Sequence, residues 1–162
     1  MSVLNASFWD QIYSDAGAYG ELPNEFLVNS INDFISREDT SLPKKVLLIG
    51  DGEGRNSIYL GSVVGFEVYS MDQSAVGMSK LDSTALAMGI SDKIHTTVAD
   101  LKDFDFSANK YDIIVSIFVH MPEELRIKVI HLLIRSRFFF QRKSWDALAE
   151  IARQEAEELA LT

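Results

Sequence analysis

The sequence predicts an α/β fold in which helices flank a doubly wound, mostly parallel sheet. A short apolar run at 46–49 leads into a turn with glycine at every second position, and an amphipathic stretch at 56–64 follows that turn. Further strand-like runs then alternate with stretches of helical periodicity. Such alternation is typical of parallel sheets whose crossover connections are right-handed.

Length and composition predict one ordinary globular domain. The chain has 162 residues, of which 47% are hydrophobic and 24% charged, which is enough apolar material for a single core. The net charge of −9 disfavours nucleic acid and anionic membranes as partners, because both are bound through clustered Lys and Arg. We therefore expect neither as a partner.

The sequence lacks the features typical of metal-binding, secreted and membrane-spanning proteins. There is no cysteine, and the three histidines have no metal-ligand spacing, so no metal site is predicted. The first ten residues do not resemble a signal peptide, and no apolar run approaches membrane-spanning length. A soluble cytoplasmic protein is the expectation.

The elements follow in order from their hydrophobic spacing. Four runs rich in branched or aromatic residues predict strands, at 46–49, 66–72, 93–99 and 111–118. Helical spacing predicts four helices, at 26–35, 56–64, 74–88 and 122–133. In the second of these helices we expect Ile58, Leu60 and Val63 to face inward. The expected strand order is 3-2-1-4, a Rossmann-like arrangement that places a ligand at the carboxyl ends of strands one and four.

The turn after the first strand reads Gly50-Asp51-Gly52-Glu53-Gly54-Arg55-Asn56. Glycine lets a ligand approach the backbone closely, and the following helix directs its free N–H groups toward the same crevice. The dinucleotide fingerprint requires a glycine where Arg55 stands, which disfavours a nicotinamide dinucleotide. A purely structural turn between strand and helix is the alternative.

Two aspartates follow later strands at matching places. Asp72 ends the second strand about 20 residues beyond the glycine turn, where a carboxylate can accept hydrogen bonds from ribose hydroxyls. The alternatives are a solvated strand-end residue or a helix N-cap. Asp100 ends the third strand and, taken alone, would be an ordinary turn aspartate.

Together these residues resemble the class I methyltransferases that depend on S-adenosyl-L-methionine (SAM). The string from Gly52 to Ser57 is most similar to the tellurite-resistance and thiopurine methyltransferase-like branch. The resemblance implies SAM as cofactor, with Asp100 meeting the adenine amino group and the backbone N–H of Leu101 a ring nitrogen. The implied cofactor-binding residues are Gly50, Asp51, Gly52, Gly54, Arg55, Asn56, Asp72, Gln73, Asp100, Leu101, Ser116, Trp9 and Tyr19.

The resemblance extends to an N-terminal cap, 1–24, which would close over the ligand. It rests on the runs Trp9-Asp10-x-x-Tyr13 and Gly20-x-x-Pro23-Asn24. Aromatic faces stabilise cations such as a sulfonium and exclude water, so Trp9, Tyr13 and Tyr19 are candidates to touch ligand; the alternative is that they only pack into the core. Tyr13 and His120 are the candidate catalytic residues, although a histidine at a strand end is often structural.

Beyond residue 133 the resemblance fails, and we expect a domain at 1–133 followed by a divergent segment at 134–162. The family continues with a Pro-Gly-Gly turn, a fifth strand and a closing hairpin, and the last strands of that pattern are missing here. Residues 138–141 predict a short strand in the fifth position, and 145–161 a last helix. Since folded proteins cover exposed sheet edges, either that helix or a second copy of the chain, in a homodimer, is expected to cover this edge.

Two functions remain open from the sequence. The first is a methyltransferase that transfers the SAM methyl group to a small-molecule acceptor, for which soft nucleophiles need little help from a general base. The second is a non-catalytic module that binds SAM or S-adenosylhomocysteine, suggested by the altered C-terminal segment. A nicotinamide-dependent reductase is a weaker third.

Overall fold

The computed structural model describes residues 5–15, 17–37, 44–105, 111–119, 121, 125, 129 and 138–142. Its helices are α1 (Ala6–Ser14), α2 (Glu25–Arg37), α3 (Arg55–Tyr59), a π-helical turn η1 (Leu60–Val64) and α4 (Ala75–Ala87). Its strands are β1 (Lys45–Ile49), β2 (Glu67–Asp72), β3 (Ile94–Val98), β4 (Ile113–Ile117) and β5 (Phe138–Arg142).

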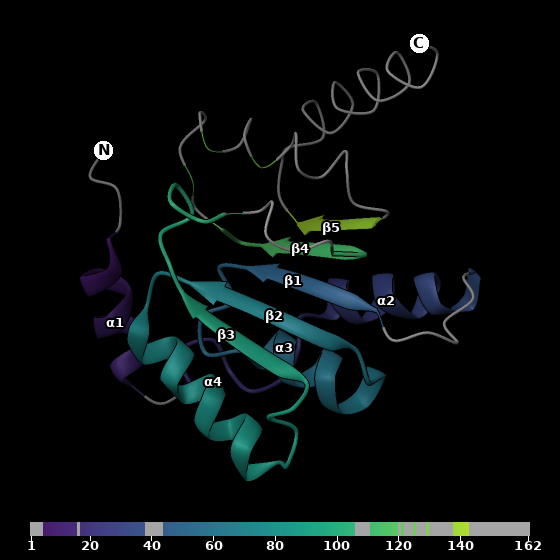
Figure 1. The fold of residues 1–162 in the computed structure, drawn as a ribbon, viewed down its shortest axis with the longest axis horizontal. Helices are drawn as coiled ribbons and strands as arrows, with labels where there is room; N and C mark the ends of the chain where they lie inside the picture. The colour runs from purple at the N-terminus through teal and green to yellow at the C-terminus, as the bar shows by residue number, and fades with distance from the viewer. Residues whose placement is uncertain are drawn as a thin grey trace.

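The five strands form one parallel sheet in the order β3-β2-β1-β4-β5. Figure 1 shows β1 at the centre, with the carboxyl ends of β1 to β3 directed toward the side on which α1 lies. The predicted order 3-2-1-4 is therefore confirmed, and β5 pairs with β4 in the fifth position, where the sequence predicts a short strand at 138–141.

Alternation along the strands divides the core between the two faces of the sheet. Val46 and Leu48 of β1 belong to the cluster in which α2, α3, η1 and α4 bury their apolar faces. Leu47 and Ile49 belong to a second cluster with Met71, on the other face. A parallel sheet covered on both faces needs strands that are apolar throughout, and β1 meets that requirement.

One expectation about the core is wrong. Val63 was expected to face inward with Leu60, but its side chain is 72% exposed. The chain between them is the π-helical turn η1, whose wider winding brings Val64 rather than Val63 onto the face of Leu60. Gly65 then ends the turn with a left-handed backbone, as its position predicts.

Several expectations fall on residues that are not described. Of the predicted helix 122–133 only two positions are described, Leu125 and Val129, and both pack in the second cluster as their spacing predicts. His120 and the predicted helix 145–161 lie outside the described residues. The domain boundary at 133 and the homodimer stay predictions. Within the described ranges, no helix has the length and apolarity needed to cross a membrane.

Candidate functional site

A cavity of about 470 Å³ opens at the carboxyl ends of β1, β2 and β4. Its wall is built from the N-terminal cap, the glycine turn and the residues that follow β2, β3 and β4. Most of the residues expected at a cofactor or catalytic site line it, namely Trp9, Tyr13, Tyr19, Gly50, Asp51, Gly52, Arg55, Asn56, Asp72, Gln73, Asp100 and Leu101. Gly54 and Ser116 do not belong to the wall, and their predicted contact with the cofactor stays a prediction.

Asp72 joins the glycine turn to the start of α4. One carboxylate oxygen, Oδ2, accepts a hydrogen bond from the backbone N–H of Gly52 at 2.9 Å, and the other, Oδ1, accepts one from the N–H of Ser74 at 2.9 Å. Burial raises the pKa of Asp72, although these backbone bonds oppose that shift. The side chain is therefore fixed at the cavity wall with further lone pairs for a ligand hydroxyl.

Two glycines are required because of what packs against them. Gly54 is the N-cap of α3 with φ of 83°, and a Cβ there would overlap the side chain of Leu81. Gly77, in the first turn of α4, lies against the backbone of the glycine turn, and its Cβ would come 2.7 Å from the carbonyl oxygen of Gly52. The glycine turn therefore packs directly against α4.

Asp51 directs its carboxyl group into the protein beneath the turn. Oδ2 accepts hydrogen bonds from the hydroxyls of Ser57 at 2.5 Å and Ser70 at 2.9 Å. Oδ1 is buried and has no hydrogen-bond partner among the described residues. Burial, with a further contribution from the charge of Asp72, raises the pKa of Asp51 to about 7.

The cap is held on the turn by polar contacts that the sequence analysis did not identify. Oδ1 of Asp10 accepts hydrogen bonds from the Ser74 hydroxyl at 2.6 Å and the Val76 N–H at 3.1 Å, so it caps α4 from α1. Glu53 accepts a hydrogen bond from the Ala18 N–H at 3.0 Å and pairs with Lys80 at 2.9 Å. The free N–H groups that begin α4 attract a carboxylate, but the sequence does not show that this carboxylate comes from a helix more than 60 positions away.

The cap also covers the turn with aromatic rings. Trp9 and Tyr13 stack with ring centroids 5.8 Å apart, and the rings of Tyr13 and Tyr19 are 6.2 Å apart. Tyr13 is buried over Gly52, and burial together with the nearby Asp72 charge raises its pKa. At neutral pH its hydroxyl is therefore protonated and suited to donating a hydrogen bond rather than to acting as a base.

Arg55, at the position that a dinucleotide site would give to glycine, joins the cap to the turn. Its Nη1 donates hydrogen bonds to the backbone carbonyls of Tyr19 at 2.6 Å and Leu22 at 3.4 Å. Beside it, the Asn56 side chain accepts a hydrogen bond from the N–H of Asn24 at 2.9 Å. The loop between α1 and α2 is thus fastened by the first two residues of α3.

Replacing Arg55 with alanine is expected to loosen this loop and to weaken ligand binding in the cavity by about 1 kcal/mol, or roughly fivefold, because partly exposed hydrogen bonds from a cation are lost. The measurements are limited proteolysis of the loop and titration with S-adenosylhomocysteine. Arg37→Ala is the matched control, since Arg37 pairs only with exposed Asp33 in the described structure and such pairs contribute little. Equal behaviour of the two variants would contradict a fastening role for Arg55.

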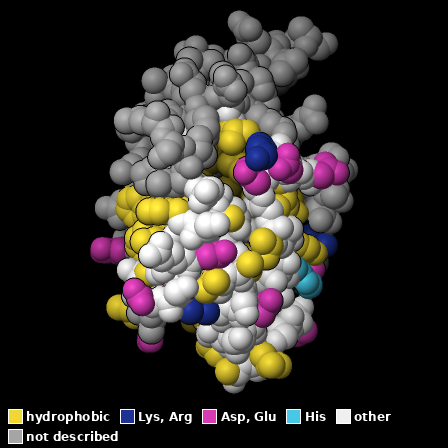
Figure 2. Space-filling model, turned by 90° about the vertical axis from the view of Figure 1, so that its left-hand side faces the viewer, with side chains coloured by type: hydrophobic (Ala, Val, Ile, Leu, Met, Phe, Trp, Pro, Cys, Tyr) yellow, Lys and Arg dark blue, Asp and Glu magenta, His cyan; other side chains and the backbone are white. Residues whose placement is uncertain are grey.

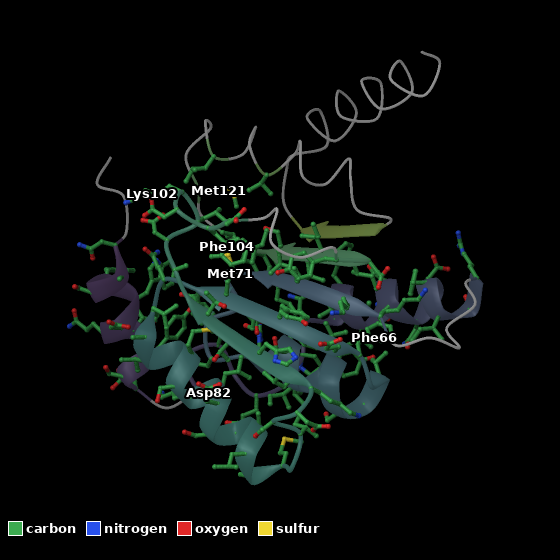
Figure 3. All side chains as sticks on the ribbon, in the orientation of Figure 1. Phe66, Met71, Asp82, Lys102, Phe104 and Met121 are labelled. Carbon is green, nitrogen blue, oxygen red and sulfur yellow. The ribbon has the colours of Figure 1, made fainter. Side chains whose placement is uncertain are left out.

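The end of the cavity beyond β4 is apolar, and the sequence analysis did not assign its residues individually. Ile117, Phe118, Val119, Met121 and Leu125 line it. Figure 3 labels Met71, Phe104 and Met121, which lie on the same side of the sheet toward the carboxyl ends of the strands. Phe118 has φ of 57°, a left-handed conformation that no other described non-glycine residue adopts. His120 lies outside the described residues, so its predicted role stays untested.

Comparison with known proteins gives one family and several relatives. The family model for tellurite resistance protein TehB matches residues 26–139. The probable S-adenosyl-L-methionine-dependent methyltransferase TehB of Haemophilus influenzae (strain 10810) is 38% identical over 79 residues, which are 49% of this chain and 26% of that protein. A probable chloroplastic tocopherol O-methyltransferase of Oryza sativa subsp. japonica is 31% identical over 84 residues, 51% of this chain and 23% of that protein.

Among solved structures, TehB from Haemophilus influenzae superposes with a TM-score of 0.61 at 21% identity, over 90% of this chain and 54% of that chain. At this identity the likeness establishes the fold alone. The chain matches about a quarter of the length of the two curated relatives.

Proposed function

Because the chain belongs to the TehB family of tellurite resistance proteins, we propose that it is a SAM-dependent methyltransferase that acts on a small-molecule acceptor. The observation that supports this most directly is the bridge from Asp72 to Gly52 and Ser74 at the wall of the cavity. It holds a carboxylate beside the backbone of the glycine turn. The cavity volume is also in the range of small-molecule and cofactor sites.

The residues present fit an adenosyl cofactor. Asp72 would accept hydrogen bonds from its ribose hydroxyls, and the segment at Asp100 and Leu101 would meet the adenine. The glycine turn packs closely against Val119 and Tyr13, because a Cβ at Gly50 or Gly52 would collide with those side chains.

When bound, SAM supplies an electrophilic methyl group on a sulfonium that carries its own leaving group. The chain's contribution is then to bind, orient and exclude water. Asp72 contributes negative charge to the cavity wall, and the aromatic rings of the cap cover it, both of which favour a cationic ligand. Neutral Tyr13 can donate a hydrogen bond into the site.

The proposal is tested by calorimetric titration with SAM, S-adenosylhomocysteine and NADH in parallel. Micromolar binding of the two adenosyl compounds without NADH supports it, and transfer of a labelled methyl group establishes turnover. Binding without transfer to any acceptor would favour the non-catalytic module instead. Failure of both adenosyl compounds to bind would refute the proposal. A cytoplasmic location and a homodimer stay predictions.

Replacing Asp72 with alanine is expected to weaken S-adenosylhomocysteine binding by about 1–3 kcal/mol, through the loss of hydrogen bonds to a charged group. Asp82→Ala is the control, because Asp82 lies on α4 away from the cavity and accepts one exposed hydrogen bond from Thr96 (Figure 3). Unchanged affinity in a folded Asp72→Ala protein would remove Asp72 from the site.

A further inference from the structure

The bridge formed by Asp72 is contacted at both ends by the cap helix α1. The carboxylate of Asp72 accepts hydrogen bonds from the backbone N–H groups of Gly52 and Ser74. Tyr13 of α1 lies against Gly52, and Asp10 of the same helix accepts a hydrogen bond from the Ser74 hydroxyl at 2.6 Å. Asp10 and Tyr13 are three positions apart, so they share one face of α1. One helix of the cap therefore touches both residues that hold the Asp72 carboxylate.

Ser74 links the cap to Asp72. It is the N-cap of α4 and is fully buried. Its hydroxyl donates to Oδ1 of Asp10 and accepts a hydrogen bond from the Gly77 N–H at 3.0 Å, while its own backbone N–H donates to Asp72. A buried donor that loses its acceptor is costly. Removal of the Asp10 carboxylate should therefore displace Ser74, and with it the N–H that orients Asp72.

Asp10 differs from an ordinary surface carboxylate of the cap. Figure 2 shows the molecule from the side on which α1 lies in Figure 1, and acidic side chains are spread over this face. Asp15, at the end of α1, is exposed, and its carboxylate accepts no hydrogen bond from the described residues. By contrast, hydrogen bonds from the Ser74 hydroxyl and the Val76 N–H lower the pKa of Asp10. Asp10 is thus ionised at neutral pH and caps the positive end of α4.

The charge of Asp10 and its hydrogen bonds act on Asp72 in opposite directions. Burial raises the pKa of Asp72, and the negative charge of Asp10 adds to that shift. The charge alone would therefore disfavour the ionised form of Asp72, whereas the hydrogen bond to Ser74 fixes the group that orients it. Asparagine separates the two effects, because it keeps an acceptor oxygen and carries no charge.

We propose that Asp10 is a positioning residue for Asp72, which fixes the α4 end of the bridge through Ser74 and thereby couples docking of the cap to ligand binding. This inference rests on the proposed function, in which Asp72 accepts hydrogen bonds from the ligand. Asp10 itself touches no ligand in this role. Since such coupling is reciprocal, a ligand held at Asp72 also favours the docked cap.

Replacing Asp10 with alanine is expected to weaken S-adenosylhomocysteine binding about tenfold, the scale of one lost hydrogen bond to a charged group. Asp10→Asn should stay within about threefold of the unmodified chain, because the acceptor for Ser74 is kept. Asp15→Ala is the matched control, since it removes the same charge from the same helix, and its affinity should be unchanged. Calorimetric titration measures all three. Equal losses in Asp10→Asn and Asp10→Ala, or equal affinities of Asp10→Ala and Asp15→Ala, overturn the proposal.

The Asp72→Ala background separates an effect on Asp72 from a general effect on the cap. If Asp10 acts through Asp72, Asp10→Ala should weaken binding there by less than about twofold, because the group that it orients is gone. An undiminished loss in that background overturns the positioning role. If Asp10→Ala does not fold, Ser74→Ala removes the other partner of the same hydrogen bond and takes its place in both comparisons. Failure of the unmodified chain to bind S-adenosylhomocysteine refutes the proposed function itself.

Discussion

Replacing Gly77 with alanine is expected to lower the free energy of unfolding by about 2–3 kcal/mol, which is toward the upper end for overpacked sites. In an ordinary helix position this substitution is stabilising by up to about 1 kcal/mol. At Gly77 the added Cβ would lie 2.7 Å from the carbonyl oxygen and 3.0 Å from the carbonyl carbon of Gly52. Both atoms are backbone, so α4 and the glycine turn must move apart.

That displacement should also reach the ligand. Gly52 donates its N–H to Asp72 and lines the cavity, so moving it disturbs both the carboxylate and the surface beside it. We expect S-adenosylhomocysteine affinity to fall by about tenfold, equivalent to about 1.4 kcal/mol. Urea unfolding and calorimetric titration measure the two effects.

Gly61→Ala is the matched control for Gly77→Ala. A Cβ at Gly61, in η1, would lie 2.7 Å from the Cδ1 atom of Ile94, which is the same distance as that between a Cβ at Gly77 and the Gly52 carbonyl oxygen. The neighbour there is the end of a flexible side chain that can change rotamer, and it lies away from the cavity wall. We expect a smaller loss of stability and unchanged affinity. Equal losses of stability and affinity in the two variants would show that contact with the turn is not what matters at Gly77.

The contact between Gly77 and Gly52 marks the limit of what the sequence predicted. Strand order and the family resemblance were confirmed, because strand runs and the glycine spacing are local signals. The packing of α4 against the turn brings together residues that are 25 positions apart in the sequence. Such a contact produces no periodic pattern from which it could be predicted. A glycine in a helix pattern is equally consistent with a weak helix position.

The same reason explains the other features that were missed. Asp10 capping α4 and the pairing of Glu53 with Lys80 both depend on how the cap docks, and no spacing rule connects these positions. Val63 was misplaced because a π-helical turn is a departure of a single residue from the α-helical period. Asp51 was predicted as a ligand-binding residue, yet the burial of its carboxyl group depends on Ser57 and Ser70 from two different elements.

The buried carboxyl of Asp51 is expected to lower the free energy of unfolding as pH rises. Replacing Asp51 with asparagine is expected to remove this pH-dependent loss of stability. Burial raises the pKa of this carboxyl to about 7 in the folded chain, from an ordinary value of 3.8. Between about pH 4 and 7 the folded state therefore binds more protons at this site than the unfolded state does. Its contribution to stability falls as pH rises through this window and is constant above it.

The magnitude follows from the size of the shift. Each pKa unit corresponds to about 1.4 kcal/mol, so the full penalty at pH 8 is at most about 4 kcal/mol. The asparagine keeps an oxygen for the Ser57 and Ser70 hydroxyls but loses the stronger bonds that a carboxylate accepts. We therefore expect Asp51→Asn to be more stable than the unmodified chain by roughly 2 kcal/mol at pH 8, with the difference vanishing near pH 4.

Urea unfolding of both proteins at several values between pH 4 and 8 measures this difference. Subtracting the two curves removes the slope of independent groups such as Asp10, which has the opposite sign, and leaves the slope of Asp51 together with its coupling to the charge of Asp72. Asp100→Asn is the contrasting control: hydrogen bonds from Lys102 lower the pKa of Asp100, so its contribution is lost as pH falls. A pH-independent difference between the unmodified chain and Asp51→Asn would mean that the buried carboxyl finds a compensating partner and does not titrate in this window.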